Sequence, residues 1–259
     1  MNSTRERLVF GALGAVLLVY IVYPFAAFLL GTRGSGFGGA GSPELHDALS
    51  NSLITALIAT AVATAFGVPL AYFLARSEFR GKGLLEALVV LPLVLPPVVG
   101  GAMLLMGVGR LTPLGSLAAA VGVPLTDSLA GVVLAQTFVA SPFVVVTSRA
   151  GFSSVDERLE QASRTMGHGP ITTFWNVSLP SARSAVAAGV VLTFARAVGE
   201  FGATMMVAYN PRTMPTLIWV DFIARGVDGV VVPSLILIAI ALAVITAVHR
   251  LEKIPTLRQ

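Results

Sequence analysis

Residues 49–75 read LSNSLITALIATAVATAFGVPLAYFLA, a stretch without a single charged side chain. An apolar run of about 18 residues or more without charges is long enough to cross a bilayer as an α-helix. Of the 259 residues of the chain, 55% are hydrophobic and 12% are charged, whereas an ordinary soluble domain is about 25% charged. So few charges do not cover the apolar surface of a soluble fold of this size. The sequence therefore predicts an all-α, multi-spanning integral membrane protein.

Working outward from this stretch, we find about six apolar runs with the length of a spanning helix. The first run follows Arg5 and Arg7, as a secretory signal would, but it is longer than the roughly 7–15 residues of a signal core, and we expect it to be retained. We expect all six runs to form one transmembrane domain over residues 1–259, without an internal repeat or a second soluble domain. The runs cover residues 8–30, 49–75, 84–108, 128–146, 185–209 and 230–248.

The distribution of lysine and arginine predicts the orientation of these spans. If both termini are cytoplasmic, about 12 of the 17 basic residues fall in inner segments and 4 in outer segments, with Arg196 inside the fifth run. Cytoplasmic loops carry the excess of positive charge in membrane proteins. We therefore expect a multi-pass protein of the cell membrane with both ends in the cytoplasm, and an even number of spans is consistent with that.

The inner loop over residues 149–183 is the longest polar stretch of the chain. Ser154 and Glu157 fit a capping box at the start of a helix. Glu160 and Arg164 have the spacing of an ion pair on the outside of that helix. The remaining positions predict one apolar face, which carries Val155, Leu159, Ala162 and Met166.

Two glycines predict a corner inside the same loop. Gly167 and Gly169 can end the first helix, and Pro170 can begin a second one at its first position. Two short helices would then present a compact knob to the cytosol. The alternative is an amphipathic helix that lies on the membrane, with Trp175 at the interface.

The spacing in this loop resembles a known family motif. Gln161-Ala162-Ser163, three residues, Gly167, nine residues, Val177, one residue and Leu179-Pro180 is similar to the Glu-Ala-Ala, Gly, Ile, Leu-Pro signature of the permease subunits of bacterial and archaeal ABC importers. In that family the loop is the coupling helix, which fits into a cleft of the cytoplasmic ATPase subunit. We therefore name residues 149–183 the coupling loop. The resemblance implies contacts with the ATPase through Glu160, Gln161, Ala162, Ser163, Arg164 and Gly167.

This chain departs from the family motif at three positions. Gln161 stands where glutamate is usual, Ser163 where the second alanine is usual, and Val177 where isoleucine is usual. The first change loses a charge that faces the ATPase in the family, and the neighbouring Glu160 could partly replace it. The other two changes are mild.

The resemblance covers nearly the whole chain. Residues 67–76 and 91–100 look like helices of oxyanion permeases, residues 194–204 resemble molybdate permeases, and residues 208–218 look most like the archaeal molybdate/tungstate type. The implied fold is a helical membrane bundle similar to type I ABC importers. The implied function is the permease subunit of an ATP-driven molybdate/tungstate importer, with a sulfate or thiosulfate permease as the alternative and an ion-gradient-driven transporter as the more distant one.

The resemblance also implies the partners. Two copies of the permease would form the path in the membrane lipid, with two ATP-binding subunits beneath them and an external oxyanion-binding protein above. ATP and magnesium would bind the ATPase, because this chain has no G-x-x-x-x-G-K-[ST] phosphate loop of its own. We therefore expect no cofactor on this chain and no enzymatic activity.

Arg196 and Glu200 lie one turn apart near the middle of the fifth apolar run. A charge at the centre of a bilayer costs about 3 kcal/mol or more on insertion scales, so such residues face the bundle interior or a water-filled path. They are candidates for the translocation path or its gate, where the Arg196 guanidinium suits contact with an oxyanion. The alternative is a structural ion pair that packs the fifth helix against its neighbours.

Glycines and prolines near these charges are further candidates for the path or gate. Gly199 and Gly202 allow close helix approach, either at a contact that changes during transport or in simple packing. Pro96 and Pro97, with Pro92, break the hydrogen-bond ladder of the third apolar run. They predict a kinked helix, which either lines the pore or kinks for packing alone.

Several functional classes are disfavoured by the same sequence. The chain has no cysteine, and its 3 histidines are scattered, so we expect no metal site. No serine–histidine–aspartate or paired-carboxylate arrangement is placed for catalysis. The net charge of +4 reflects the orientation of the loops, and we expect no nucleic-acid partner.

Overall fold

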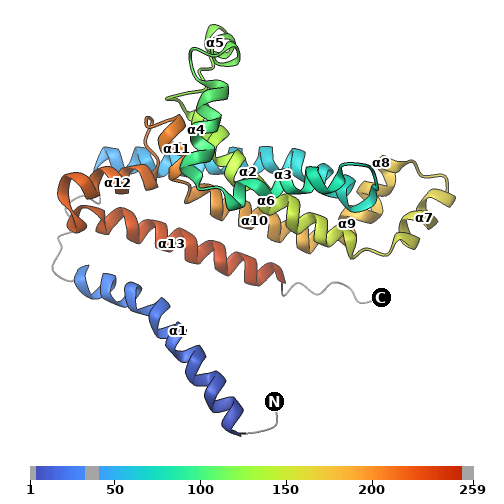
Figure 1. The fold of residues 1–259 in the computed structure, drawn as a ribbon, viewed down its shortest axis with the longest axis horizontal. Helices are drawn as coiled ribbons and strands as arrows, with labels where there is room; N and C mark the ends of the chain where they lie inside the picture. Colours follow the sequence, from blue (N-terminus) through green and yellow to red (C-terminus); the bar gives the residue numbers. More distant parts are fainter. Residues whose placement is uncertain (1–3, 33–40, 253–259) are drawn as a thin grey trace.

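The computed structural model describes residues 4–32 and 41–252. Every regular element in these two ranges is a helix, which confirms the all-α prediction for them (Figure 1). Residues 1–3, 33–40 and 253–259, including both chain ends that the sequence places in the cytoplasm, lie outside the described part.

Four helices are long and apolar enough to cross a membrane. They are α1 (Thr4–Gly31), α2 (Pro43–Arg76), α6 (Leu129–Ser153) and α13 (Val227–Glu252). The number reaches six when two strongly bent pairs of helices are each counted as one span. This range includes the six spans that the apolar runs predict.

The core of the bundle forms where α2, α6 and α10 (Arg183–Val198) pack along the long axis of the molecule (Figure 1). At Gly189 of α10, an added Cβ would lie 3.1 Å from the Cα of Val144 in α6. Small residues let membrane helices approach closely enough for their backbones to pack. One buried cluster of this kind consists of Ala56, Ala59, Ala140, Ala197 and Val198.

The third apolar run is broken more sharply than a kink. The chain bends by 115° between α3 (Lys82–Val94) and α4 (Pro97–Val108). Residues 84–108 therefore form two helices, and the prediction of a single kinked helix is wrong. Neither Pro96 nor Pro97 has a backbone N–H to continue the ladder, and Leu95 is extended with ψ 137°. α4 consequently leaves the bundle, and α5 (Pro113–Ala120) follows it in an arm that stands away from the core (Figure 1).

The fifth apolar run is interrupted as well. α10 ends at Val198, and α11 (Gly202–Val207) starts only after the break at residues 199–201. The single helix expected over residues 185–209 is therefore wrong. The Oε1 atom of Glu200 accepts a hydrogen bond of 2.7 Å from the backbone N–H of Ala203. This side-chain acceptor replaces a missing helical carbonyl and allows the chain to begin a new helix inside the bundle.

Two helices lie outside this core. α12 (Met214–Arg225), which the sequence analysis left as an outer segment, packs against α13 and α2. α1 stands apart from the bundle (Figure 1), and none of its most apolar stretch is buried within this chain.

The contact of α4 with α11 depends on a glycine. A Cβ on Gly101 would lie 2.7 Å from the Cα of Ala203, which is backbone and cannot move aside alone. We expect Gly101→Ala to lower the free energy of unfolding by about 1–3 kcal/mol, as overpacking does, seen as a lower Tm in detergent. The matched control is Gly107→Ala on the same helix, where nothing lies within 4 Å of the new Cβ. Equal Tm values for the two variants would contradict this close contact.

Candidate coupling site and translocation path

The first helix that lies wholly inside the coupling loop is α7 (Glu157–Thr165), and Asp156 is its N-cap. An oxygen of the Asp156 side chain accepts a hydrogen bond of 2.9 Å from the N–H of Arg158. Ser154 instead donates to the carbonyl of Gly151 at 2.7 Å, because α6 extends to Ser153 and leaves Ser154 in its last turn. The predicted capping box of Ser154 and Glu157 is therefore wrong by two residues.

The glycine corner at the end of α7 is confirmed. Gly167 has φ +89°, a left-handed conformation that glycine adopts without strain, and its N–H bonds to the carbonyl of Arg164 at 3.0 Å. Gly169 caps α8 (Pro170–Thr173), with Pro170 at the first position. A π-helical turn (Phe174–Ser178) and α9 (Leu179–Ser181) lead to α10. These helices form one end of the molecule (Figure 1).

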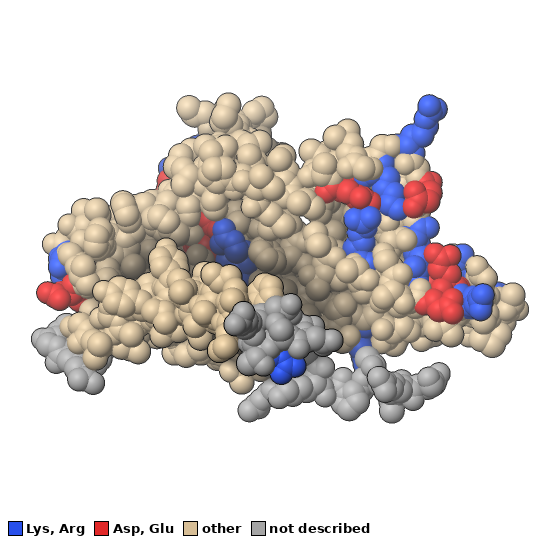
Figure 2. Space-filling model, turned by 60° about the horizontal axis from the view of Figure 1, so that its bottom comes forward, with Lys and Arg blue, Asp and Glu red and all other residues tan. Residues whose placement is uncertain are grey.

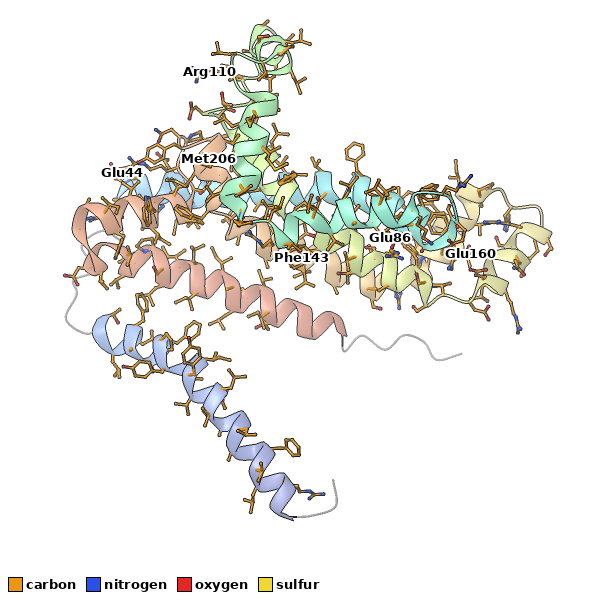
Figure 3. The ribbon with its side chains drawn as sticks, in the orientation of Figure 1. Glu44, Glu86, Arg110, Phe143, Glu160 and Met206 are labelled. Carbon is orange, nitrogen blue, oxygen red and sulfur yellow. The ribbon has the colours of Figure 1, made fainter. Side chains whose placement is uncertain are left out.

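Glu160 points into this end of the protein, not outward. It is only 3% exposed, and its Oε1 lies 3.0 Å from Arg76 Nε and 2.9 Å from Arg76 Nη2. The hydroxyl of Ser178 donates to the same oxygen at 2.8 Å, and that of Tyr72 donates to Oε2 at 3.3 Å. The carboxylate thus joins α7 to the end of α2 and to the π-helical turn before α10. Figure 3 labels Glu160 at this end of the molecule. We call Glu160, Arg76, Ser178 and Tyr72 the buried clamp.

The clamp corrects two sequence-based expectations. The outward ion pair of Glu160 with Arg164 does not form among the described residues. Glu160 also cannot supply the ATPase-facing charge that Gln161 lacks, because its carboxylate is buried against Arg76. Periodicity predicts Glu160 on the outside of α7, but it could not show that Arg76 of α2 covers this side of the helix.

Glu160 remains ionised in this setting. Burial by itself raises the pKa of the carboxyl group, but hydrogen bonds from Arg76 and Ser178, the positive charge of Arg76 and the hydrogen bond from Tyr72 outweigh it. The pKa of Glu160 is therefore held below its ordinary value. Arg76 also donates to the carbonyl of Val155 at 3.1 Å, so it fixes the start of α7 as well.

Ser163 has a structural role that the family comparison did not predict. Its side chain is buried, and its Oγ lies 3.0 Å from Thr173 Oγ1 and 3.2 Å from His168 Nδ1. A hydroxyl at this position therefore ties α7 to α8 across the glycine corner, where the family's alanine has no such group. Of the predicted coupling residues, Gln161, Ala162, Arg164 and Gly167 are exposed.

The exposed side of the coupling loop carries large apolar side chains among polar ones. Leu159 and Met166, expected on the apolar face of α7, point outward together with Ile171 and Trp175. Only Val155 of that predicted face is buried. Exposed large apolar side chains grouped with polar ones are typical of a surface that another protein covers.

The predicted ion pair in the membrane is present. Arg196 Nη2 lies 2.5 Å from Glu200 Oε2, and the Glu200 side chain is 1% exposed whereas that of Arg196 is 28% exposed. Charged residues gather mainly at the ends of the molecule, and a blue and red spot lies in a hollow of the otherwise uncharged middle (Figure 2). Glu200 additionally caps α11, a role that the sequence analysis did not foresee.

The structure brings the two helix breaks together. An added Cβ on Gly202 would lie 3.1 Å from the Cβ of Pro97, so α11 starts directly against the start of α4, which Pro96 caps. Gly199, by contrast, has only the carbonyl of Ala195 nearby, at 3.6 Å. Close packing therefore explains Gly202 but not Gly199.

The described residues include no group of three or more histidine, cysteine or acidic side chains that could hold a metal ion. The candidate site consists of an exposed surface with large apolar side chains, a buried clamp and a pair of helix breaks that carry one ion pair.

Residues 67–254 match the family of binding-protein-dependent transport system inner membrane components, and the chain belongs to this family of multi-pass membrane permeases. It is 48% identical over 244 residues to the "Probable molybdenum ABC transporter permease protein" of Haloferax volcanii, covering 94% of this chain and 89% of that protein. It is also 36% identical to the "Molybdate/tungstate transport system permease protein WtpB" of Pyrococcus abyssi, with 91% of each chain covered.

A solved structure shares the fold. The bacterial alginate ABC transporter in complex with its pentasaccharide-bound periplasmic protein has a chain that superposes with a TM-score of 0.76, over 96% of this chain and 95% of that one. Because the two sequences are 13% identical, this similarity shows the fold alone. It confirms the predicted helical bundle of the ABC importer type.

The clamp predicts a defined stability effect. Glu160→Gln removes the buried charge opposite Arg76, and we expect it to lower the free energy of unfolding at pH 7 by about 3 kcal/mol, the lower end of the range for breaking a buried pair. Since folding lowers the pKa of Glu160 from about 4.5, its contribution is complete above that pH and is lost as the pH falls through the folded-state pKa. Unfolding by urea in detergent at several pH values measures both effects.

The matched control is Glu157→Gln on the same helix. Glu157 is 68% exposed and lies 3.8 Å from Arg76, so its pair is worth at most about 1 kcal/mol. The loss on acidification below about pH 4.5 should be smaller in Glu160→Gln than in Glu157→Gln. Equal stability of the two variants would show that the clamp is not a buried pair.

Proposed function

We propose that this chain is the membrane subunit of an ATP-driven importer that carries molybdate or tungstate into the cell. The observation that carries the class is the coupling loop, in which an exposed apolar surface stands on a buried clamp. The substrate is supported by the relatives in Haloferax volcanii and Pyrococcus abyssi, whose names specify molybdenum and molybdate/tungstate permeases. ATP and magnesium bind a separate ATPase subunit in this scheme, and the chain itself is not an enzyme.

The ATPase docks on the exposed side of the coupling loop. Leu159, Met166 and Ile171 supply apolar area, while Gln161 and Arg164 supply polar contacts at its side. The clamp then transmits a displacement of α7 to two elements. It acts on α2 through Arg76 and on the turn before α10 through Ser178. Because both links meet at one carboxylate, α7 cannot shift without loading both helices.

Two copies of the chain form the transport unit. α1 is uncharged from Leu8 to Gly31, and its exposed faces in a single copy leave it free to contact lipid and a second copy. The excess of basic residues in the inner segments supports cytoplasmic termini, and α13 runs from the α12 end back toward the end with the coupling loop (Figure 1). An external oxyanion-binding protein delivers the substrate at the α12 end.

The oxyanion passes the helix breaks. Arg196 is the partly exposed cation of the membrane-embedded ion pair, and its guanidinium can donate two hydrogen bonds to a tetrahedral dianion. A tight permanent site is not needed here, since a path that binds too strongly does not release. The α4–α11 contact at Gly202 and Pro97 lies beside this pair, so it is the natural place for a gate.

The glycine corner gives a test of docking. Gly167→Asp forces a side chain onto a position with φ +89°, and we expect it to distort the end of α7 and to lower ATP-coupled uptake at least tenfold while membrane insertion stays intact. The matched control is Gly169→Asp, at a capping position with φ −71°, where aspartate is a favoured residue. Normal uptake by the Gly167 variant would remove the coupling loop from the mechanism.

Oxyanion uptake tests the function as a whole. The chain is expressed with its ATPase and binding protein in cells that lack their own molybdate importer, beside an otherwise identical system with an inactive ATPase. We expect radiolabelled molybdate or tungstate to enter only with the active ATPase. Uptake of sulfate alone would keep the class and refute the substrate, and uptake that persists with the inactive ATPase would indicate a transporter driven by an ion gradient.

A further inference from the structure

The side chain of Gln136 in α6 is completely buried, and neither its amide nitrogen nor its amide oxygen has a hydrogen-bond partner among the described residues. Nearly all buried polar side chains in proteins are hydrogen-bonded. An amide in hydrocarbon surroundings without any partner is costly, and its neighbours in sequence are apolar or small. A partner that Gln136 acquires in another state of the protein would explain why an amide stands here.

The packing of α6 on α10 and α11 shows which residues lie opposite Gln136. An added Cβ on Gly131 would lie 3.3 Å from the Cβ of Ala208, and one on Gly189 would lie 3.1 Å from the Cα of Val144. α6 therefore runs antiparallel to the segment that α10 and α11 form. Gln136 lies between these two contacts along α6, at the level of the break that contains Glu200.

The helical period of α6 gives the direction of Gln136. Ala135 and Val139 pack toward α11 in one buried cluster, and Ala140 packs toward α10 and α2 in another. At about 100° per residue, Gln136 projects between these two directions. Its side chain is therefore directed between α11 on one side and α10 and α2 on the other, the region in which Glu200 is also buried.

The ion pair at this junction is unequal. Arg196 is partly exposed and long enough to turn away, whereas Glu200 is 1% exposed and holds the start of α11 through its bond to Ala203. If Arg196 turns toward an oxyanion in the path, the carboxylate cannot follow it. Glu200 would then remain as a buried charge without its counter-ion, which strongly destabilises a protein.

We infer that Gln136 is a positioning residue that takes over the Glu200 carboxylate when Arg196 engages the substrate. The amide N–H groups of Gln136 then donate to Glu200 Oε2, the oxygen that Arg196 leaves, while Oε1 keeps its bond to Ala203. The exchange frees Arg196 for the oxyanion without leaving an unpartnered carboxylate and without uncapping α11. This inference rests on the proposed import of an oxyanion.

The test replaces the amide by an apolar side chain of similar shape in the complete transporter. Gln136→Met should leave the Tm in detergent unchanged or higher, because an unsatisfied amide is removed from the resting structure, and should lower ATP-dependent molybdate uptake at least tenfold. The matched control is Thr193→Val on α10. Like Gln136→Met, it removes a buried polar group without a partner, in this case a hydroxyl, but Thr193 lies two turns before Glu200. That control should transport at the parent rate.

A second comparison tests whether the effect of Gln136→Met on uptake depends on the carboxylate of Glu200. We expect Glu200→Gln to lower uptake by about tenfold, and Gln136→Met to lower it no further in that background, because residues that act on one another are not additive. Uptake at the parent rate in Gln136→Met, or an equal further loss in the Glu200→Gln background, would overturn the inference. So would loss of folded protein in both Gln136→Met and Gln136→Leu, since the amide would then be structural. A parent transporter that carries no molybdate or tungstate would instead refute the proposed substrate.

Discussion

The end of this permease that carries the coupling loop depends on one buried carboxylate. Glu160 is only 3% exposed, so its charge must be compensated by Arg76 and by the hydroxyls of Ser178 and Tyr72. These partners come from two separate parts of the chain, α2 and the turn before α10. A buried pair of this kind adds little net stability when compared with apolar packing, but it specifies one geometry. In the proposed function, that geometry makes the exposed surface of the coupling loop and the membrane helices move as a single lever.

A second constraint acts inside the membrane, where backbone groups have no water to bind. Prolines at residues 96 and 97 and the break at residues 199–201 interrupt two spans, and the structure places the interruptions against each other at Gly202 and Pro97. Glu200 replaces a missing backbone acceptor at the start of α11. The charge that satisfies the backbone is also the charge that pairs with Arg196. The structure thus shows the architectural role of this pair, and its role in the path is part of the proposed function.

Much of this arrangement was predictable from the sequence, and the failures have physical causes. Hydropathy predicts the spans because lipid excludes charge, and the left-handed conformation at Gly167 follows from its place at a helix end. Periodicity defines faces but not what covers them, so it assigned Leu159 and Met166 to a packed face although they are exposed, and Glu160 to the outside although Arg76 covers it. Pro96 and Pro97 predict a kink but not the size of the bend, and α12 packs through tertiary contacts that no local pattern encodes. Ser163 shows that a departure from a family motif can be compensated by a nearby partner, here Thr173.

The most direct test of the lever is the distance between α7 and α2 during the ATPase cycle. The chain contains no cysteine, so spin labels can be attached at Arg158→Cys on α7 and Phe73→Cys on α2, both exposed positions, in the assembled transporter. Pulsed electron paramagnetic resonance then gives the distance between the labels within one copy, without nucleotide and with ATP trapped by vanadate. We predict the same distance in both states, because the buried clamp moves α7 and the end of α2 as one body. A distance that changes by several Å on ATP binding would show that the coupling loop moves independently of α2 and would contradict this account.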